Sequence, residues 1–318
     1  MKLLASLLLF LFCATAKAQA YPSKPIRLVV PFAPGGSSTI VARSVAAEMS
    51  KSLGQEIYIE NKGGGGGNVA MHDVARADAD GYTLIISHIG SLALNPFLYR
   101  NLPFDVNRDF APVSLLAKVP NIFVVHADVP AKDLSEFVAL AKKDPGRLYY
   151  GSAGNGSAGH LAMEYLKLVA GIQVQHVPYK GTGPNLVDLI AGRTQATSAG
   201  TPPLMPHVKA GKLRVIAVGS PNRISVLPEV PTVAEQGYPG FETSQWYGLS
   251  APAKTPAAVI KRLADEAARA VKSPEVIERF VVDSAEPIGS TPQQYAEFIA
   301  KEQARWKEVI QRANVKVD

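Results

Sequence analysis

The stretch Leu28–Met49, LVVPFAPGGSSTIVARSVAAEM, joins a β-branched apolar run to a glycine turn and then to a helical pattern. Pro34–Gly36 forms the turn, and Val41, Val45 and Met49 follow at the four-residue spacing of an amphipathic helix. A strand, a glycine turn and a helix N-terminus together predict an anion site. Free backbone N–H groups converge there, and the helix dipole adds about half a positive charge.

Two interpretations of this turn fit its residues. Pro34 fixes the backbone ahead of the turn, and Gly35–Gly36 allows a ligand to approach the backbone closely. The hydroxyls of Ser37, Ser38 and Thr39 can donate to a ligand or cap the helix. The turn is therefore either an anion site or a capped turn without a ligand.

The first twenty residues, MKLLASLLLFLFCATAKAQA, have the pattern of an export signal. Lys2 precedes the apolar core Leu3–Ala14, which is too short to span a bilayer, and A-x-A cleavage patterns end at Ala18 and Ala20. Cys13, the only cysteine, follows a phenylalanine rather than the small residue that precedes a lipid-modified cysteine. We predict a cleaved signal peptide over residues 1–20; the alternative is a membrane anchor. The mature chain then has no cysteine and no disulfide.

Composition and charge narrow the class of protein. The whole chain carries 33 basic and 27 acidic residues, and removing Lys2 and Lys17 with the signal leaves 31 basic residues against 27 acidic ones. The basic residues are dispersed without interleaved aromatics, which argues against a nucleic-acid partner. About 300 mature residues with 47% apolar composition predict two compact domains in a soluble exported protein.

The mature chain begins with alternating strand-like and helix-like segments. Strands are predicted over Ile26–Pro31, Glu56–Glu60 and Tyr82–Ser87, with helices over Thr39–Leu53 and Asn68–Arg76. This order favours a parallel α/β sheet.

Three connections in the first half of the chain have a distinctive composition. The run Gly63–Gly67 costs much conformational entropy to order, so by itself it indicates a flexible linker. Asn95–Pro112 is rich in Pro, Asn and Asp and is predicted to be irregular. Two apolar runs meet around Pro120-Asn121, where we predict a crossing between domains.

The strand–turn–helix pattern recurs about 120 residues further on. A helix over Leu134–Lys143 is followed by a short strand, Leu148–Gly151, and by the glycine/serine turn Gly151–Ser157. The turn opens a helix whose apolar positions include Leu161, Tyr165, Leu168 and Val169. Two such turns facing across a cleft could clamp one small anion from both sides.

The second turn matches the dinucleotide pattern only weakly. It contains Gly154-x-Gly156-x-x-Gly159, but no acidic residue lies between Glu164 and Asp188 to hold ribose hydroxyls. The chain has no G-x-S-x-G or P-loop motif, and its six histidines form no H-E-x-x-H, so no catalytic residue, metal site or cofactor is predicted. His160 is interpreted as a packed or capping residue. The Asp and Glu residues are not paired by spacing, so the sequence alone does not exclude a catalytic pair of carboxylates.

The last third adds strands over Val215–Gly219 and Trp246–Ser250. Prolines at Pro256, Pro274 and Pro292 each follow a hydroxyl residue and are predicted to occupy the first helical position. The last helix is predicted to present a core face made of Tyr295, Phe298, Ile299, Trp306, Val309 and Ile310.

Taken together, these segments resemble the Bug-type extracytoplasmic solute receptors of tripartite tricarboxylate transporters. The resemblance covers the mature chain. It is carried by YPSKPIRLVVPFAPGG (21–36), ENKGGGGGN (60–68), DGYTLIIS (80–87), NPFLY (95–99), YGSAGNGSAGHL (150–161), HVPYKGTGP (176–184), AGKLRVIAV (210–218), LPEVPTVAEQG (227–237) and WYGLSAPAKTP (246–256).

The resemblance implies a type II periplasmic-binding-protein fold, in which two α/β lobes joined by a two-strand hinge close over a ligand in a central cleft. Domain 1 would comprise residues 21–122 and 245–318, and domain 2 residues 123–244. It implies a monomeric periplasmic protein that is not an enzyme and that presents a small organic anion to membrane permease subunits. It also implies that the glycine run is a connection inside domain 1.

The resemblance further implies the ligand-binding residues. These are Phe32, Ala33, Pro34, Gly35, Gly36, Ser37, Ser38 and Thr39 of the first turn, Ser152, Gly154, Asn155, Gly156 and Ser157 of the second, and Ser87, His88 and Tyr179. Backbone amides, hydroxyls and ordered water would hold a carboxylate. Cap, surface and hinge-packing roles fit Ser87, His88 and Tyr179 equally well.

The sequence departs from the family pattern at Thr39, where many relatives carry Asp, and near Gly63, where Pro is common. Without the acidic residue we expect a plain carboxylate, mono- or dicarboxylate and aromatic acids included, rather than a ligand with an ammonium group. Two other functions are not excluded by the sequence. The protein could be a ligand-sensing partner of a membrane signalling protein, or a secreted α/β hydrolase if a Ser/His pair converged in the cleft.

Overall fold

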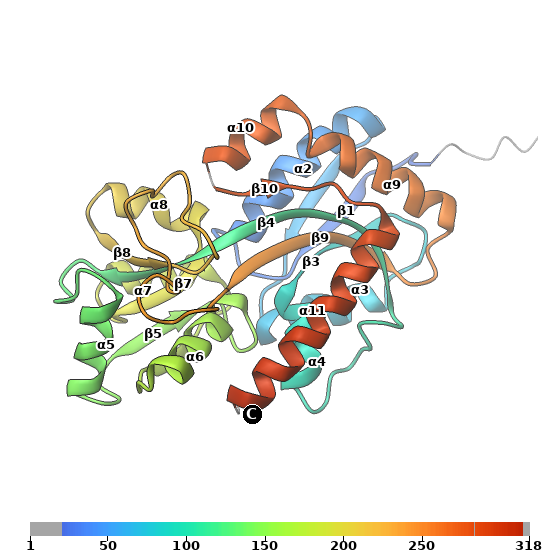
Figure 1. Cartoon of the computed structure of the whole chain (residues 1–318). Helices are drawn as coiled ribbons and strands as arrows, with labels where there is room; N and C mark the ends of the chain where they lie inside the picture. The colour runs from blue at the N-terminus through green and yellow to red at the C-terminus, as the bar shows by residue number, and fades with distance from the viewer. Residues whose placement is uncertain (1–20, 283, 314–318) are drawn as a thin grey trace, which may run out of the picture.

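The computed structural model describes residues 21–282 and 284–313, and its strands follow one continuous hydrogen-bonded path (Figure 1). The path runs β2-β1-β3-β9-β4-β7-β5-β6, and β8 and β10 both pair with β4. The strands are β1 (Ile26–Val30), β2 (Ile57–Asn61), β3 (Thr83–His88), β4 (Phe110–His126), β5 (Tyr149–Ser152), β6 (Gln175–Pro178), β7 (Ala196–Gly200), β8 (Leu213–Val218), β9 (Ser244–Pro252) and β10 (Glu286–Pro287).

The helices lie on both faces of this sheet, as the alternating sequence pattern predicts. They are α2 (Ser37–Leu53), α3 (Asn68–Ala75), α4 (Asn95–Leu98), α5 (Leu134–Lys143), α6 (Ala158–Ala170), α7 (Thr182–Ile190), α8 (Thr201–Lys209), α9 (Ala257–Ala270), α10 (Pro274–Val282) and α11 (Pro292–Ala313), with a 3₁₀ turn η1 (Gly65–Gly67) and a π turn η2 (Gly90–Leu94).

Strand β4 divides the structure into two lobes. Its first half pairs with β9 from Phe110 to Pro120, whereas from Asn121 onward it pairs with β7 along one edge and with β8 along the other. Lobe 1 contains β1, β2, β3, β9, β10 and the first half of β4; lobe 2 contains the second half of β4 with β5 to β8. The change of partner falls at Pro120-Asn121, where the two apolar runs meet in the sequence. These runs form one strand of 17 residues.

Lobe 1 buries apolar side chains on both faces of its sheet. In β1, Leu28 and Val30 face α2, α9 and α10, while Val29 faces α3, η2 and α11. This is the two-residue alternation of a strand buried on both sides. The last helix contributes Tyr295, and its predicted core face is confirmed, because Ile299, Trp306 and Ile310 are buried and Phe298 and Val309 pack against them.

Lobe 2 repeats this arrangement with its own helices. Phe123 and Val125 of β4 face α5 and α6, whereas Ile122 and Val124 face α7 and α8. Two of the apolar positions of α6 are not in its core: Leu168 is 44% exposed, and the neighbouring Val169 is 38% exposed. An amphipathic helix buries only one of its faces. The buried face of α6 is the one that carries Leu161 and Leu166.

Some predicted boundaries shift by a residue or more. Pro274 and Pro292 begin α10 and α11 as predicted, but α9 begins at Ala257, so Pro256 is its N-cap rather than its first helical residue. The segment predicted to be irregular, Asn95–Pro112, contains the short helix α4 and the start of β4. Gly63–Gly67 connects β2 to α3 inside lobe 1 and is not a linker between lobes.

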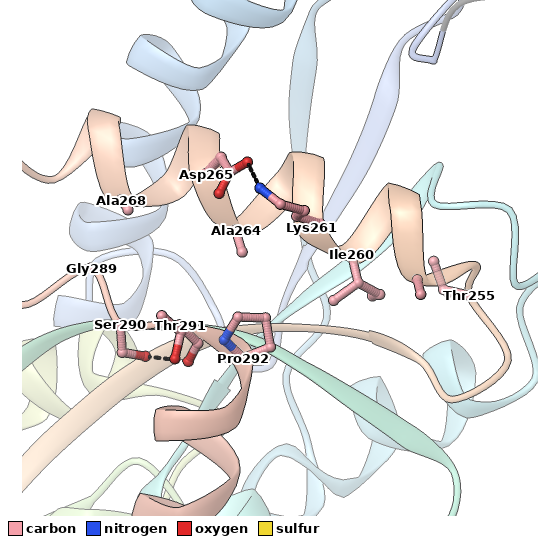
Figure 2. A pocket seen from close by; sticks show the side chains of 11 residues that line it. Thr255, Ile260, Lys261, Ala264, Asp265, Ala268, Gly289, Ser290, Thr291 and Pro292 are labelled. Carbon is pink, nitrogen blue, oxygen red and sulfur yellow. Dashed lines mark hydrogen bonds and ion pairs between the residues drawn. The ribbon is translucent and has the colours of Figure 1, made fainter.

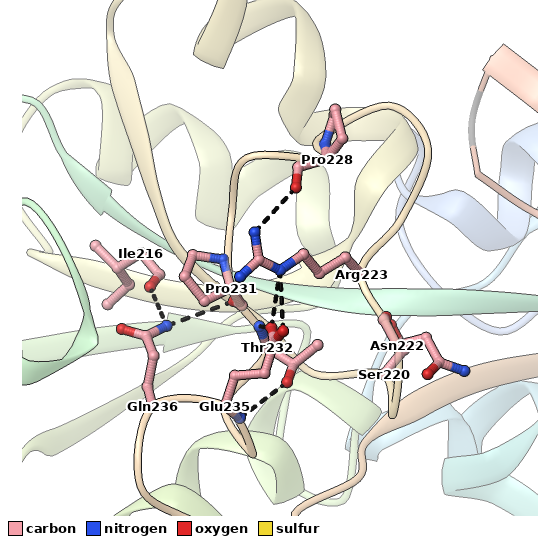
Figure 3. A network of polar contacts seen from close by, with 9 residues as sticks. All are labelled: Ile216, Ser220, Asn222, Arg223, Pro228, Pro231, Thr232, Glu235 and Gln236. Atoms are coloured by element: carbon pink, nitrogen blue, oxygen red, sulfur yellow. Dashed lines mark hydrogen bonds and ion pairs between the residues drawn. The ribbon is translucent and has the colours of Figure 1, made fainter.

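A long connection, residues 219–243, returns the chain from β8 to β9 and is cross-braced by polar contacts (Figure 3). The Arg223 guanidinium pairs with the Glu235 carboxylate at 3.0 Å and donates to the Pro228 carbonyl. Glu235 accepts from the Thr232 backbone N–H, and Thr232 Oγ1 accepts from the Glu235 N–H. This reciprocal pair fixes the loop that leads from lobe 2 back into β9 of lobe 1.

A buried hydroxyl cluster ties β3 to β9 and α11. Ser87 Oγ lies 2.8 Å from Ser250 Oγ and 2.9 Å from the Tyr295 hydroxyl, and it donates to the Gly248 carbonyl. Its side chain is fully buried. In lobe 1, Ser87 therefore joins the sheet to the last helix.

We expect Ser87→Ala to lower the free energy of unfolding by about 1–2 kcal/mol, because two buried hydroxyls each lose a partner. Ser44→Ala is the matched control: its hydroxyl bonds only to the Ile40 carbonyl of its own helix, so the expected loss is under about 0.5 kcal/mol. Urea denaturation of both variants measures the difference. Equal losses would contradict the structural role given to Ser87.

Candidate functional site

A narrow cavity lies where the two lobes meet, at the carboxyl ends of the parallel strands. Its lining residues are Phe32, Ser37, Ser38, His88, Ala153, Ser157, Ala158, Gly159, Thr182, Asn185, Ser198, Ala199, Gln245 and Tyr247. The cavity leaves about 20 Å³ for the centre of a water-sized sphere, which is room for about one water molecule. The lobes are therefore closed on each other.

Four helices begin at this cavity. Helix α2 contributes Ser37 and Ser38 from its first turn, α6 begins at the lining residue Ala158, and α7 begins at the lining residue Thr182. Helix α8 begins two residues after the lining residue Ala199. The N-termini of α2, α6 and α7 bring backbone N–H groups and their partial positive charge to the cavity, which makes it electropositive. Helix α8 adds little, because Pro202 and Pro203 in its first turn have no N–H.

Three of these four helices have no side-chain cap. No side-chain hydrogen bond closes the N-caps Gly36, Gly181 and Gly200 of α2, α7 and α8, whereas Ser157 caps α6 by accepting from the His160 N–H. Backbone N–H groups in the first turn of an uncapped helix need acceptors from outside the helix. An anion placed in the cavity would supply them.

The side chains in the cavity wall are neutral. Of the lining residues that the structure describes, none is Asp, Glu, Lys or Arg. Burial lowers the pKa of His88 to about 3, so this imidazole is uncharged at neutral pH. Its Nδ1 accepts from the Gly90 N–H at 2.9 Å, which assigns the ring proton to Nε2. Within the described ranges 21–282 and 284–313, His88 Nε2 and Ser198 Oγ have no hydrogen-bond partner.

The structure brings part of the first turn to the cavity. Phe32, Ser37 and Ser38 line it, and the Phe32 ring packs on the His88 ring with centroids 4.6 Å apart. Thr39 is buried away from it and accepts from Asn61 Nδ2 at 2.9 Å.

The other predicted residues of this turn face lobe 2 instead of the cavity. The Ala33 N–H donates to the Lys180 carbonyl. A side chain on Gly35 would meet the Gly183 backbone at 3.1 Å, one on Gly36 would meet Thr182 at 3.3 Å, and the Pro34 carbonyl lies against Gly183.

In the second turn, Ala153 and Ser157 line the cavity, and the other predicted residues support it from outside. Ser152 is buried and bonds to His176 Nε2 at 2.7 Å. The Gly156 N–H donates to His160 Nδ1, which agrees with the packing role predicted for that histidine. Gly154 lies against the Tyr179 carbonyl, and the Asn155 carbonyl accepts from Tyr99 of lobe 1.

Three residues were predicted outside the two turns, and only His88 lines the cavity. Ser87 points to the opposite face of β3, into the hydroxyl cluster with Ser250 and Tyr295. The Tyr179 hydroxyl donates to Asp188 at 2.7 Å and is directed away from the cavity.

Several residues that line the cavity lie outside the two predicted turns and were not predicted from the sequence. Thr182 and Asn185 come from α7, Ser198 from β7, and Gln245 and Tyr247 from β9. A local signal existed for α7, because Gly181-Thr182-Gly183-Pro184 follows a strand in the same way as the two predicted turns. Gln245 and Tyr247 carry no such signal; they line the cavity because alternate residues of β9 share one face.

Ser152 and His176 form a Ser/His pair, but the pair does not line the cavity. Ser152 Oγ also accepts from the Gly154 N–H, so it holds the second turn in place. Within the part of the chain that the structure describes, no three His, Cys, Asp or Glu residues are grouped to hold a metal ion. In the same residues no helix has both the length and the apolar character needed to cross a bilayer.

A wider groove of about 590 Å³ lies on lobe 1 between α9 and the segment before α11 (Figure 2). Ile260, Ala264 and Pro292 give it aliphatic walls, and Lys261 and Asp265 pair with each other at its edge at 2.7 Å. All its lining residues lie between 255 and 292, so lobe 2 contributes nothing to it. Helices α9 and α11 begin at its edge, at Ala257 and Pro292.

The buried histidines near the cavity make stability depend on pH. Burial is the main cause that lowers the pKa of His88 and His176 to about 3 and that of His160 to about 4. In the unfolded chain these residues bind a proton below about pH 6.5, while the folded protein leaves them neutral. Stability is therefore complete above pH 6.5 and falls as pH decreases toward 4.

We expect each buried histidine to remove up to about 1.4 kcal/mol of stability per pH unit below pH 6.5. Urea denaturation at pH 7.5 and pH 5.5 measures the loss in the wild type and in His160→Gln. The variant should lose about a third less than the wild type over this interval. An equal loss in both proteins would contradict the neutral state assigned to His160.

Comparison with known proteins agrees with this geometry. The family described as "Tripartite tricarboxylate transporter family receptor" matches residues 41–315. The chain is 36% identical over 305 residues to Protein BugT of Bordetella pertussis, covering 96% of this chain and 94% of that protein.

Two solved structures with bound ligands are similar over almost the whole chain. Rpa4515 of R. palustris, solved with adipate, has a TM-score of 0.90 and 37% identity, covering 93% of this chain and 99% of that one. MatC of Rhodopseudomonas palustris, solved with bound malate, has a TM-score of 0.88 and 34% identity, covering 91% and 100%. The fold is thus that of periplasmic binding proteins, and the chain belongs to the tripartite tricarboxylate transporter receptor family, whose members are periplasmic solute-binding receptors and not enzymes.

Proposed function

We propose that this protein captures a small organic carboxylate between its two lobes in the periplasm and delivers it to the membrane permease of a tripartite transporter. The observation that carries the proposal is the convergence of the N-termini of α2, α6 and α7, two of them without a side-chain cap, on a cavity with neutral walls. Such a site favours an anion without a fixed positive side chain.

The division of the chain follows from this mechanism. We assign residues 21–122 and 245–318 to one domain and residues 123–244 to the other, with residues 1–20, which lie outside the described residues, as the cleaved signal peptide. The two domains move about the strands β4 and β9. Closure requires ligand contacts from both sides, because only a ligand that binds the closed state more tightly shifts the equilibrium toward it.

Adipate and malate in the related structures support a carboxylated ligand for this chain as well. Neutral donors suit such a ligand because they keep release reversible: a buried Arg–carboxylate pair would add charge-assisted hydrogen bonds that must be broken. The cavity leaves room for about one water, so the lobes must part further to hold a dicarboxylate.

The residues near Thr39 support a ligand without an ammonium group. Thr39 is buried and accepts from Asn61, and no carboxylate side chain lines the described cavity. An ammonium group there would lie among helix N-termini of the same sign without a counter-charge. We therefore expect thermal-shift measurements to show stabilisation by mono- and dicarboxylates but not by amino acids. A clear preference for amino acids would contradict the proposed ligand class.

A second test places a negative charge at the cavity. Ser38→Asp should weaken carboxylate binding at least about 100-fold, because two like charges about 4 Å apart repel by several kcal/mol at protein dielectric values. Ser52→Asp is the matched control, since it lies at the exposed far end of the same helix. Isothermal titration calorimetry compares both with the wild type. Binding by Ser38→Asp at wild-type strength would refute the site.

A further inference from the structure

The glycine run Gly63–Gly67 packs directly against the second lobe. Gly66 lies under the Asn155 carbonyl so closely that a Cβ on Gly66 would stand 1.9 Å from that oxygen. A Cβ on Gly63 would stand 2.5 Å from the Lys180 carbonyl oxygen. Both oxygens belong to lobe 2. A Cβ never approaches another atom so closely, so this contact between lobes requires glycine at both positions.

Hydrogen bonds reinforce the contact on both sides. The Tyr99 hydroxyl, in lobe 1, donates to the Asn155 carbonyl at 2.9 Å. Asn95 Nδ2 donates to the Gly66 carbonyl at 3.2 Å and to Asn68 Oδ1 at 2.7 Å, which anchors the glycine run to lobe 1. Nearby, the Ala33 N–H donates to the Lys180 carbonyl at 2.9 Å.

These residues form a surface separate from the cavity. Gly63, Gly66, Tyr99, Asn155 and Lys180 are absent from the described cavity lining. The contacts join protein atoms to protein atoms, so closure through them needs no ligand. They also exist only when the lobes are closed, because each one connects lobe 1 to lobe 2.

We propose that the glycine run is a latch: a backbone surface on lobe 1 that receives the Asn155 and Lys180 carbonyls and holds the lobes closed without touching the ligand. The latch stabilises the closed conformation of the ligand-free protein. This effect does not depend on the proposed carboxylate-binding function.

The first experiment compares Gly66→Ala with Gly54→Ala in ligand-free protein. Both glycines have left-handed backbone angles, with φ of +60° and +67°, so both substitutions introduce similar strain. A side chain at Gly54 meets nothing within 4 Å, whereas one at Gly66 meets Asn155 of the other lobe. Only Gly66→Ala should therefore open the lobes.

Small-angle X-ray scattering reports the opening as a larger radius of gyration. We expect Gly54→Ala to match the wild type and Gly66→Ala to be more open, with equal unfolding midpoints for the two variants. Identical scattering from both variants would overturn the latch. Should Gly66→Ala fail to fold, Tyr99→Phe gives the same comparison, with Tyr21→Phe as its control.

The tyrosine pair is matched in its hydrogen bonds. Tyr99 and Tyr21 both donate to a backbone carbonyl, but the Tyr21 bond to Gly81, at 2.6 Å, stays inside lobe 1, whereas the Tyr99 bond joins the two lobes. Tyr99→Phe should therefore scatter as a more open protein than Tyr21→Phe, and identical scattering from these two variants would overturn the proposal.

Discussion

The carboxyl ends of the parallel strands in both lobes face one cleft, and the arrangement of the site follows from this constraint. A helix that follows a parallel strand starts at that strand's carboxyl end, so its N-terminus lies at the cleft. Strand β4 runs through both lobes and thereby holds the two sets of strand ends opposite each other. In this way α2 from lobe 1 meets α6, α7 and α8 from lobe 2 at a single cavity. The positive character of that cavity comes from backbone geometry and not from a lysine or arginine.

The glycines serve this arrangement in two different ways. Two of them, Gly36 and Gly181, stand at N-caps where the absence of a side-chain cap leaves N–H groups available. Others, such as Gly66 and Gly183, allow the backbone of one lobe to contact that of the other. A glycine-rich turn in a protein of two lobes therefore does not indicate ligand contact by itself. The opposite lobe can occupy the space that the missing side chain leaves.

The features that could be predicted from the sequence are those that depend on residues close together in the chain. The first two strand–turn–helix units, the alternation of strands and helices, the crossing at Pro120-Asn121 and the core face of α11 all depend on short-range patterns, and the structure has them. The pattern could not show which side of β3 faces the cavity, so Ser87 and His88 were grouped although adjacent strand residues point to opposite faces. Nor could it show Gln245 and Tyr247, because they reach the cavity only through the pairing of β9 with β4 far along the chain. The partner of the glycine run, Asn155, is likewise set by tertiary contact.

The central claim is that helix N-termini and neutral donors, without a charged side chain, hold a carboxylate between the lobes. A crystal structure of the protein with its most tightly bound carboxylic acid tests this claim most directly. We expect carboxylate oxygens within hydrogen-bond distance of backbone N–H groups at the starts of α2 and at least one of α6, α7 and α8, with no Lys or Arg side chain within 4 Å. A ligand in the groove between α9 and α11, or one held by an Arg or Lys ion pair, would contradict it.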